Sequence, residues 1–567
     1  MPFASALPGL RLCANMKLYN VSQEGLKEVM DMGMFLNSIA PYEKYRAISC
    51  SRYFVDKSLL LEELIEGMGA EPQYICVTRP RRFGKTVMAN MIGAFFGQAV
   101  SSGNIFERLK ISASGQYSQH CNKHDIIYID FSKIPEACSS YGEYIARFSD
   151  GLKADLVQFC PALKLDKNKA VWDLFNEVFY RNGRRKFIFI LDEWDAIFHM
   201  SFASDNDKKS YLLFLKNLLK DQEYVEMVYM TGILPIAKYS DGSELNMFVE
   251  YSMPSQIRFS EYFGFTEQEV DTLYERYKNV IKFPRITRDE LRQWYDGYYT
   301  AAGKRMYNPR SVVCALTNNQ LDNYWTSSGT YDSVFYYVKN NIDDVRNDIA
   351  LLVAGEPIPA TIQEYAATSM ELKTKEEIYS AMVVYGLLTY QDGCVSIPNK
   401  ELMLSFETMI KRENSLGYIH RLADGSSRML AATLAGDTKT MADILQYAHD
   451  TETPVLSYNN ETELAALVNL VYLSARDRYR VEREDKAGKG FVDFIFYPKR
   501  PYEDCLILEL KVDVSPKEAV AQIKDKQYML RFKGKLGEAP FYTGRILAVG
   551  ISYNKSSKEH SCQVEIL

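Results

Sequence analysis

One segment of the chain reads Tyr74-Ile-Cys-Val-Thr-Arg-Pro-Arg-Arg-Phe-Gly-Lys-Thr86. It begins with a short apolar run that is typical of a β-strand and continues through a basic, turn-prone loop. It ends in Gly-Lys-Thr, and the apolar-rich segment 87–96 that follows is typical of a helix. Strand, loop and helix in this order, with the Gly-Lys-Thr ending, are what a phosphate-binding loop requires. The segment therefore predicts a nucleotide-binding α/β domain.

Each residue of this ending has an expected task. Gly84 lets the backbone approach a phosphate, whose charge the helix N-terminus favours. Lys85 is expected to reach the β- and γ-phosphates of ATP, and the Thr86 hydroxyl to bind Mg²⁺. Arg79 and Arg82 are predicted as further nucleotide contacts. Arg79 stands where the usual pattern has its first glycine, so a plain strand-turn-helix with a basic loop is the alternative.

A second stretch, Lys186-Phe-Ile-Phe-Ile-Leu-Asp-Glu-Trp-Asp195, is an apolar run that ends in acids. Buried parallel strands are continuous apolar runs, and ligands of open α/β sheets collect at the carboxyl ends of the strands. We therefore expect Asp192 to hold the Mg²⁺ that Thr86 binds. Glu193 is expected to orient and activate the attacking water.

Strand and helix candidates alternate along this part of the chain. Thr231 ends the strand candidate 225–232 and is predicted to hydrogen-bond the γ-phosphate or the water. An arginine finger is expected if the chain forms a homo-oligomer, with Arg258 as one of several candidates. The alternation predicts a doubly wound parallel sheet; its remaining members are the strands 125–132 and 186–192 and the helices 142–160, 168–181 and 208–221.

The residues Thr78-Arg-Pro-Arg-Arg-Phe-Gly-Lys-Thr86 resemble the phosphate loop of mostly bacterial AAA-ATPase-like proteins that carry a C-terminal PD-(D/E)XK nuclease-like domain. In that family the first glycine of the loop is typically replaced, as at Arg79. The family usually has Tyr where this chain has Trp194. The resemblance implies an AAA-like domain that binds ATP and Mg²⁺. Further matches run in family order from about residue 50 to about residue 330: Tyr53-Phe-Val-Asp-Lys-Ser58, Leu191-Asp-Glu-Trp-Asp195, Thr231-Gly-Ile233, Phe263-Gly-Phe-Thr-Glu267, Trp294-Tyr-Asp-Gly-Tyr298 and Tyr307-Asn-Pro309.

The C-terminal region has chemistry of its own on two strand candidates, 490–496 and 505–512. Residues i and i+2 of a strand share a face, so Glu509 and Lys511 project together. Charged side chains on an otherwise apolar strand need a partner, because burying them alone is costly. Asp493 and Glu509 as oxygen ligands of a metal would supply one, with Lys511 positioning or deprotonating the attacking water. The alternative is a hairpin with a Glu509–Lys511 salt bridge.

Asp493, Glu509 and Lys511 match the Asp…Glu-x-Lys signature of the PD-(D/E)XK nucleases. This resemblance implies a restriction-endonuclease-like α/β domain that cleaves phosphodiesters. It also implies that Glu461 is a further catalytic acid near the metal. The wider match includes four more residues, of which Gln522 and Tyr528 are expected to line the site: Glu484, Gly490, Gln522 and Tyr528.

Composition limits the class of protein. The chain has 567 residues with 47% hydrophobic and 25% charged residues, which is ordinary for globular domains. Its net charge of −6 gives no general attraction to nucleic acid. Ten cysteines without metal-binding spacing predict reduced thiols in the cytoplasm. No apolar run reaches the roughly 18 residues of a membrane span, and the first fifteen residues lack the features of a signal peptide.

We predict four segments: an arm and lead-in helix (1–45), the AAA-like P-loop domain (46–285), a mostly helical connector (286–450) and the nuclease-like domain (451–567). The predicted function is ATP binding and hydrolysis combined with Mg²⁺-dependent cleavage of nucleic acid, with DNA favoured over RNA and cleavage gated by ATP. One alternative is an ATP-dependent switch whose C-terminal domain binds nucleic acid or protein without cutting. Another is an ATPase with a degenerate C-terminal scaffold.

Overall fold

The structure is a computed structural model that describes residues 33–69, 72–98, 105–236, 244–325, 342–362, 374–451, 461–487, 490–532 and 541–567. These residues form two compact units. The first unit contains the described residues up to Trp325 together with Ser380–Gln391. The second contains residues 342–362, 374–379 and Asp392–Leu567. The bounds of the four predicted segments stay predictions, and residues 1–32 of the predicted arm lie outside the described residues.

A five-stranded parallel sheet organises the first unit. Its order is β2-β3-β4-β1-β5, so β1 lies between two strands that follow it in sequence. All four pairings are parallel. The predicted parallel sheet is therefore confirmed, and its strands are β1 (Tyr74–Thr78), β2 (Asp125–Asp130), β3 (Phe187–Asp192), β4 (Val225–Gly232) and β5 (Val249–Tyr251).

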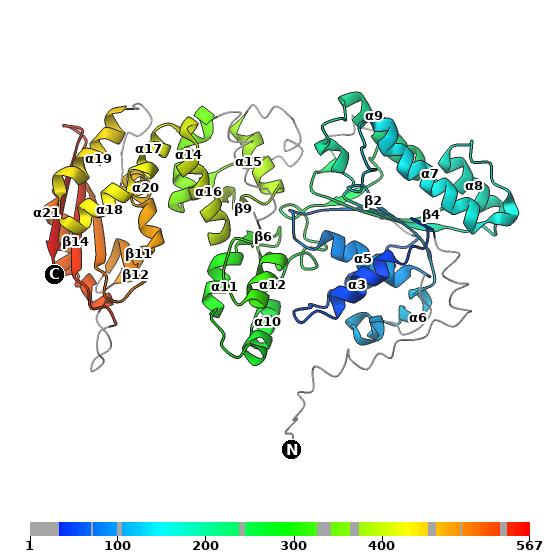
Figure 1. Ribbon diagram of the computed structural model, residues 1–567, viewed down its shortest axis with the longest axis horizontal. Coiled ribbons are helices and arrows are strands. Elements are labelled where there is room, and N and C mark those ends of the chain that lie inside the picture. Colours follow the sequence, from blue (N-terminus) through cyan, green and yellow to red (C-terminus); the bar gives the residue numbers. More distant parts are fainter. Residues whose placement is uncertain are drawn as a thin grey trace, which may run out of the picture. The chain divides into compact units, whose positions relative to one another are not determined.

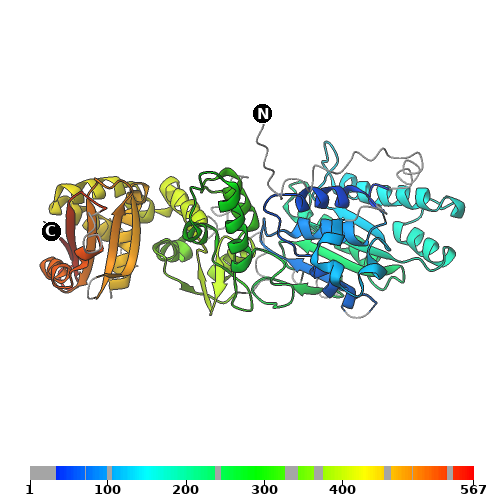
Figure 2. The same cartoon turned by 90° about the horizontal axis from the view of Figure 1, so that it is seen from below.

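Helices cover both faces of this sheet. Figure 1 shows α3 (Ala40–Ser49) and α5 (Lys85–Phe96) on one face, with α7 (Tyr141–Phe159), α8 (Val171–Arg181) and α9 (Asp205–Leu219) on the other. Figure 2 views the unit from the α3 side and shows α3 and α5 lying across the strands. Because both faces are covered, the central strands are mostly apolar, and every residue of β3 is buried.

A smaller helical layer completes the first unit. It consists of α10 (Glu267–Val280), α11 (Arg288–Tyr295), the β6–β7 hairpin (Tyr298–Tyr299 and Arg305–Met306) and α12 (Pro309–Asn318). Thr266 and Thr287 start α10 and α11 with reciprocal capping boxes, which satisfy the first amides of each helix. The helices share an apolar core of their own around Tyr277 and Tyr295.

The second unit combines helices with a mixed sheet. The sheet order is β11-β12-β13-β14-β15, and only the β13–β14 pair is parallel. In Figure 1, α21 (Pro516–Asp525) covers one face of this sheet, and α18 (Ser426–Ala435) and α20 (Glu461–Val471) cover the other. The strands are β11 (Tyr479–Ala487), β12 (Gly490–Pro498), β13 (Cys505–Val512), β14 (Ile546–Asn554) and β15 (Glu559–Ile566).

A polar network ties the remaining helices of this unit to the sheet region. Arg476, which follows α20, donates to Glu407 of α16 (Lys400–Arg412) and to Asn469. Asn469 in turn donates to the last turn of α14 (Ile342–Ala354) at Val353 O, 3.0 Å away. Both the Glu407 and Asn469 side chains are buried, so the network specifies how these helices pack.

The described residues contain neither a helix that could span a membrane nor a disulfide bond. Within the described ranges, no helix combines the length and apolar character that crossing a bilayer requires. The nine cysteines in these ranges are free thiols, and Cys13 lies outside them.

Candidate functional site

The loop between β1 and α5 has the geometry of a tight anion-binding turn. Gly84 caps α5 with a left-handed backbone, φ 90°, and Arg82 also has a positive φ of 72°. Glycine adopts this conformation without cost, whereas a side chain there adds strain. These two positive φ values therefore fix the backbone path of the loop that leads into the first amides of α5.

Lys85 lies inside this loop rather than above it. Its side chain is 7% exposed, and Nζ donates to the carbonyl oxygens of Arg79 (2.8 Å) and Pro80 (3.0 Å). Burial lowers the pKa of the Lys85 amine to about 8, although the nearby carboxylates of Asp195, Glu193 and Asp192 act in the opposite direction. The amine is thus positioned by the loop backbone and by a concentration of negative charge.

Asp192 ends β3 and is 1% exposed. Its carboxylate accepts a hydrogen bond from the Thr231 hydroxyl at the end of β4 and a longer one, 3.4 Å, from Tyr128. Burial raises the pKa of Asp192, while hydrogen bonds from Thr231 and Thr86 oppose that rise. The structure therefore brings together Thr86, Asp192 and Thr231, three side chains that the sequence placed on separate elements.

Glu193 differs from its neighbour in exposure and backbone. It is exposed, and its φ of 51° places a non-glycine residue in the left-handed region. Backbone strain of this kind costs free energy and clusters at functional sites. Glu193 thus presents a carboxylate to solvent directly beside the buried Asp192.

Two predicted arginines have partners within the protein. The Arg79 guanidinium is buried, donates to Tyr251 O at 2.6 Å and lies 5.1 Å from the centre of the Phe263 ring. Arg258 donates to Glu63 O at 3.2 Å. Arg82 is half-buried in the loop. Their predicted contacts with nucleotide, and the arginine-finger role of Arg258, stay predictions.

Sequence reasoning assigned no task to Asp195, which the structure shows as an organiser of the same edge. The carboxylate is 3% exposed and accepts hydrogen bonds from the amides of Ile233 (2.9 Å) and Leu234 (2.8 Å). It thereby fixes the chain as it leaves β4 after Thr231. An acidic residue three positions after Asp192 was the available signal, but its partners lie about forty residues away in sequence.

The second candidate site is on β12 and β13. The two strands are antiparallel, with Phe494 opposite Leu508, and continuing this register by one residue places Asp493 opposite Glu509. Asp493 Oδ2 also accepts a 2.7 Å hydrogen bond from the amide of Leu510. The two carboxylates that the sequence assigned to a metal are therefore neighbours across the hairpin.

Glu509 is the most perturbed acid of this group. It is 3% exposed, and burial, together with the negative charge of Asp493, raises its pKa to about 7. Its Oε1 accepts from Lys511 Nζ at 3.3 Å and from the Gln522 amide of α21. Its Oε2 is buried and accepts no hydrogen bond from the described residues. An acid with one unsatisfied buried oxygen is suited to bind a cation.

The donor set fits Mg²⁺ in part. Asp493 and Glu509 supply hard oxygen atoms, and a cation between them would relieve their mutual repulsion. Across the described ranges, no three His, Cys, Asp or Glu side chains cluster closely enough to form a complete metal site. The side chains of the predicted acid Glu461 and of Glu484 lie outside the described residues, and Gly490 is the first residue of β12.

The predicted lining residues from the following segment are present at this site. Gln522 contacts Glu509, and Tyr528, at the start of the short helix Tyr528–Arg531, is influenced by the charges of Glu509, Asp493 and Lys511. Burial raises the pKa of the Tyr528 hydroxyl, so it stays protonated and able to donate.

Comparisons with known proteins match the two regions of the chain that carry these sites. Residues 39–240 match the family described as Predicted AAA-ATPase (AAA-ATPase-like), and residues 460–558 match the PD-(D/E)XK nuclease superfamily. The chain joins an AAA-ATPase-like domain to a PD-(D/E)XK nuclease superfamily domain. The resemblance stated from the sequence is thereby confirmed, as are the parallel P-loop sheet and the C-terminal mixed sheet.

Individual relatives add less. The chain is 24% identical over 292 residues to an uncharacterised protein in the vnfD 5′ region of Azotobacter chroococcum mcd 1. That match covers 49% of this chain and 51% of the relative, so the chain spans about half the length of the curated relative. Two solved structures are also similar: the Walker-type ATPase of Pyrococcus abyssi (13% identity, 62% of this chain and 94% of that one, TM-score 0.32) and the ORC2 protein of Aeropyrum pernix (12%, 65% and 93%, TM-score 0.29). At these TM-scores neither structure identifies a function.

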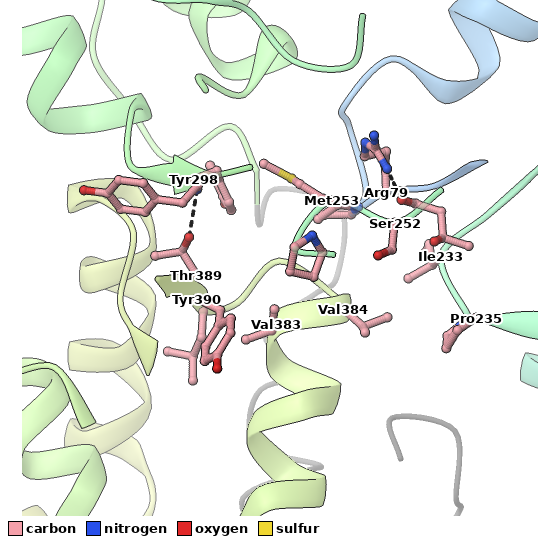
Figure 3. A pocket seen from close by; sticks show the side chains of 15 residues that line it. Arg79, Ile233, Pro235, Ser252, Met253, Tyr298, Val383, Val384, Thr389 and Tyr390 are labelled. Atoms are coloured by element: carbon pink, nitrogen blue, oxygen red, sulfur yellow. Dashed lines mark hydrogen bonds between the residues drawn. The ribbon is translucent and has the colours of Figure 1, made fainter. Parts of the chain in front are cut away.

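Residues 380–391 belong to the same unit as the phosphate loop of the AAA-ATPase-like domain and pack against this loop. The Tyr298 hydroxyl donates to Gly386 O at 3.1 Å. The Tyr299 amide donates to the Thr389 hydroxyl at 3.0 Å (Figure 3). A Cβ on Gly386 would lie 2.6 Å from Pro80 of the loop. The hollow lined by Pro80, Tyr298, Tyr299 and Thr389, among others, measures about 30 Å³, which is room for a water molecule rather than a nucleotide.

Proposed function

We propose that the chain binds and hydrolyses ATP at the β1–α5 loop and hydrolyses phosphodiester bonds of DNA at the β12–β13 hairpin. The observation that carries the nuclease assignment is Glu509, whose buried Oε2 has no hydrogen-bond donor among the described residues beside Asp493 and Lys511. A buried carboxylate that served only a salt bridge would be expected to have both of its oxygens hydrogen-bonded.

In the ATPase half, Lys85 and the first amides of α5 would hold the phosphates, with the charge of Lys85 favoured once phosphate oxygens replace the loop carbonyls. Thr86 and Asp192 would hold the Mg²⁺ that accompanies ATP. Glu193, which is exposed at the end of the strand, would accept a proton from the attacking water. Thr231 would relay the presence of the γ-phosphate to Asp192 through the hydroxyl that already bonds it.

In the nuclease half, Asp493 and Glu509 would hold Mg²⁺, which supplies charge neutralisation for an attack on a phosphate. Lys511 would orient the attacking water and stabilise the negative charge that develops on the phosphate oxygens. Gln522 donates to Glu509 Oε1 and would hold the carboxylate in place. Glu461 would be an additional acid, by resemblance to the superfamily.

We further propose that ATP binding or turnover gates cleavage. This coupling is motivated by the occurrence of both sites on one chain. The competing function is an ATP-dependent switch that binds nucleic acid or protein without cutting, and it is favoured by the observation that the described residues bring only two carboxylates to the hairpin. A cytoplasmic location and a homo-oligomeric state stay predictions.

The test is cleavage of plasmid and single-stranded DNA with Mg²⁺ or Mn²⁺, with and without ATP. Lys511→Ala should abolish cleavage, whereas Lys524→Ala, an exposed lysine on α21 paired with Glu565, should leave it unchanged. Cleavage that depends on ATP in the wild type and is altered in Lys85→Ala would establish gating. Wild-type protein that cuts neither DNA nor RNA while still binding ATP tightly would favour the switch.

A further inference from the structure

A large aromatic ring stands exposed on the helical layer of the first unit. Phe283 follows α10 and is 72% exposed, the highest value among the large hydrophobic side chains described as exposed. Val280, one turn earlier, is 47% exposed. A single exposed ring is ordinary on a protein surface, so its significance depends on the groups that adjoin it.

The segment that carries Phe283 is held in place by buried polar groups. The buried Tyr277 hydroxyl accepts from the amides of Arg285 (2.9 Å) and Ile286 (3.2 Å) and bonds Asn319 at the end of α12. Asn319, in the left-handed conformation, donates to Phe283 O at 3.0 Å. The turn is therefore specified from two helices, and the outward position of the ring is a consequence of that specification.

Two exposed cations adjoin this ring although the chain as a whole is acidic. Lys282 Nζ lies 5.5 Å from the centre of the Phe283 ring, and the exposed Arg285 follows Phe283 by two residues. Within the described parts of the chain, no carboxylate forms an ion pair with Lys282 or Arg285. The net charge of −6 makes this local positive surface a departure from the rest of the molecule.

The acidic side chains of α10 do not pair with Lys282 or Arg285, because each already contacts another cation. Glu275 pairs with Lys278 at 2.7 Å, and Glu269 pairs with the buried Lys57. Asp271 and Glu267 share Arg288. The exposed surface formed by Lys282, Phe283 and Arg285, called here the Phe283 surface, therefore keeps its positive sign.

We propose that the Phe283 surface binds single-stranded nucleic acid, with an unpaired base stacked on the Phe283 ring and phosphates held by Lys282 and Arg285. An aromatic platform flanked by cations is the arrangement that binds single strands without reading their sequence. A duplex offers no free base face to the ring, so single strands should be preferred. This inference rests on the proposed action on nucleic acid, but it concerns binding by the first unit and not the chemistry at Asp493 and Glu509.

The experiment is fluorescence anisotropy of the full chain with labelled single-stranded DNA, single-stranded RNA and duplex DNA, in EDTA so that no cleavage occurs. Phe283→Ala should weaken single-strand binding about tenfold, the loss of one stacked base, and Phe283→Trp should restore it. Ile257→Ala, which removes another exposed apolar side chain (66%), should change nothing. Because Phe283 is exposed, its removal should leave the melting temperature and ATP turnover at wild-type values.

Salt dependence gives a second measurement. Lys282→Gln with Arg285→Gln should lower the slope of log affinity against log salt concentration by about 0.7 for each phosphate contact removed. Wild-type affinity in Phe283→Ala together with an unchanged salt slope in the double variant would overturn the proposal, as would a wild-type protein that binds no nucleic acid. A change of oligomeric mass in Phe283→Ala, with nucleic-acid binding intact, would overturn it in favour of a protein interface. Cleavage is read separately through Lys511→Ala, so the nuclease assignment and this surface fail independently.

Discussion

The two candidate sites both bury a carboxylate at a strand, with a lysine beside it, but they satisfy that carboxylate differently. Asp192 accepts from the hydroxyls of Thr231 and Tyr128, and its lysine, Lys85, bonds the backbone of the phosphate loop. Glu509 has Lys511 and the Gln522 amide on one oxygen, and no donor among the described residues on the other.

This difference separates two ways of preparing a site for a phosphate. At the nucleotide site the backbone of the loop and the helix start carry out the binding, and the side-chain network is already satisfied without a ligand. At the hairpin the side chains themselves are incomplete, because two carboxylates face each other and one oxygen is unsatisfied. We therefore expect the first site to be stable without ligand and the second to gain stability from a cation.

The largest expected effect comes from replacing the lysine of each site by alanine. Lys85→Ala should reduce ATP hydrolysis roughly 10²–10³-fold, because it removes a preorganised charge at the phosphates. Steady-state phosphate release would measure it. Lys511→Ala should leave ATP hydrolysis unchanged, and Lys169→Ala, an exposed lysine paired with Glu177, is the matched control. Equal loss of ATP hydrolysis in Lys85→Ala and Lys511→Ala would mean that the two sites are not chemically separate.

A second effect concerns Glu509 and pH. Its pKa of about 7 lies above the ordinary value of 4.5. At a pH between these two values Glu509 is therefore protonated in the folded state and ionised in the unfolded state. Stability without metal should therefore fall as pH rises from about 4.5 to about 7, by up to about 3 kcal/mol. Glu509→Gln removes this cost, so in EDTA it should raise the melting temperature at pH 8 and change little at pH 4.5.

Thermal melts at both pH values, repeated with Mg²⁺, would test this. Mg²⁺ should stabilise the wild type at pH 8 and should not stabilise Glu509→Gln to the same extent. The control is Glu518→Gln, because Glu518 lies on α21 and accepts from Ser515 at an exposed position. Equal stabilisation of wild type and Glu509→Gln at pH 8 by Mg²⁺ would show that the cation binds elsewhere.

Much of this arrangement follows from the sequence, because topology decides it. The carboxyl ends of parallel strands meet at one edge, so Thr86, Asp192 and Thr231 converge whatever the details of packing. The i, i+2 rule places Glu509 and Lys511 on one face, and an antiparallel hairpin then brings Asp493 opposite. These inferences need only strand direction and register.

The remaining features depend on partners that are distant in sequence. Arg79 points inward because Tyr251 O and the Phe263 ring receive its guanidinium, and neither is recognisable from the loop itself. Gly386 packs against the phosphate loop from about 300 residues away. The positive φ of Glu193 is set by the turn after β3. Short-range patterns carry no signal for contacts of this kind.

A smaller effect is expected at Gly232, where β4 meets the segment after β3. A Cβ at this position would lie 2.5 Å from Cδ1 and Nε1 of the buried Trp194 and 2.9 Å from Asp195 Oδ1. Gly232→Ala should therefore destabilise the protein by roughly 1–3 kcal/mol and lower ATP hydrolysis, because Thr231 is displaced from Asp192. Gly115→Ala, with no atom within 4 Å of the added Cβ, is the control for chemical denaturation. An unchanged stability in Gly232→Ala would show that the nucleotide site is looser than the hairpin site.

The smallest expected change in stability concerns the backbone of Glu193. Its φ of 51° is unfavourable for glutamate and neutral for glycine, so Glu193→Gly should raise the free energy of unfolding by about 1 kcal/mol while removing ATP hydrolysis and keeping ATP binding. Lys164→Gly is the matched control, because Lys164 is exposed with φ 50° and has no assigned role at either site. It should gain similar stability with full turnover. If Lys164→Gly gained stability and Glu193→Gly did not, the left-handed backbone at Glu193 would store no strain. Glu193 would then be as well accommodated without a ligand as the buried side chains of the nucleotide site.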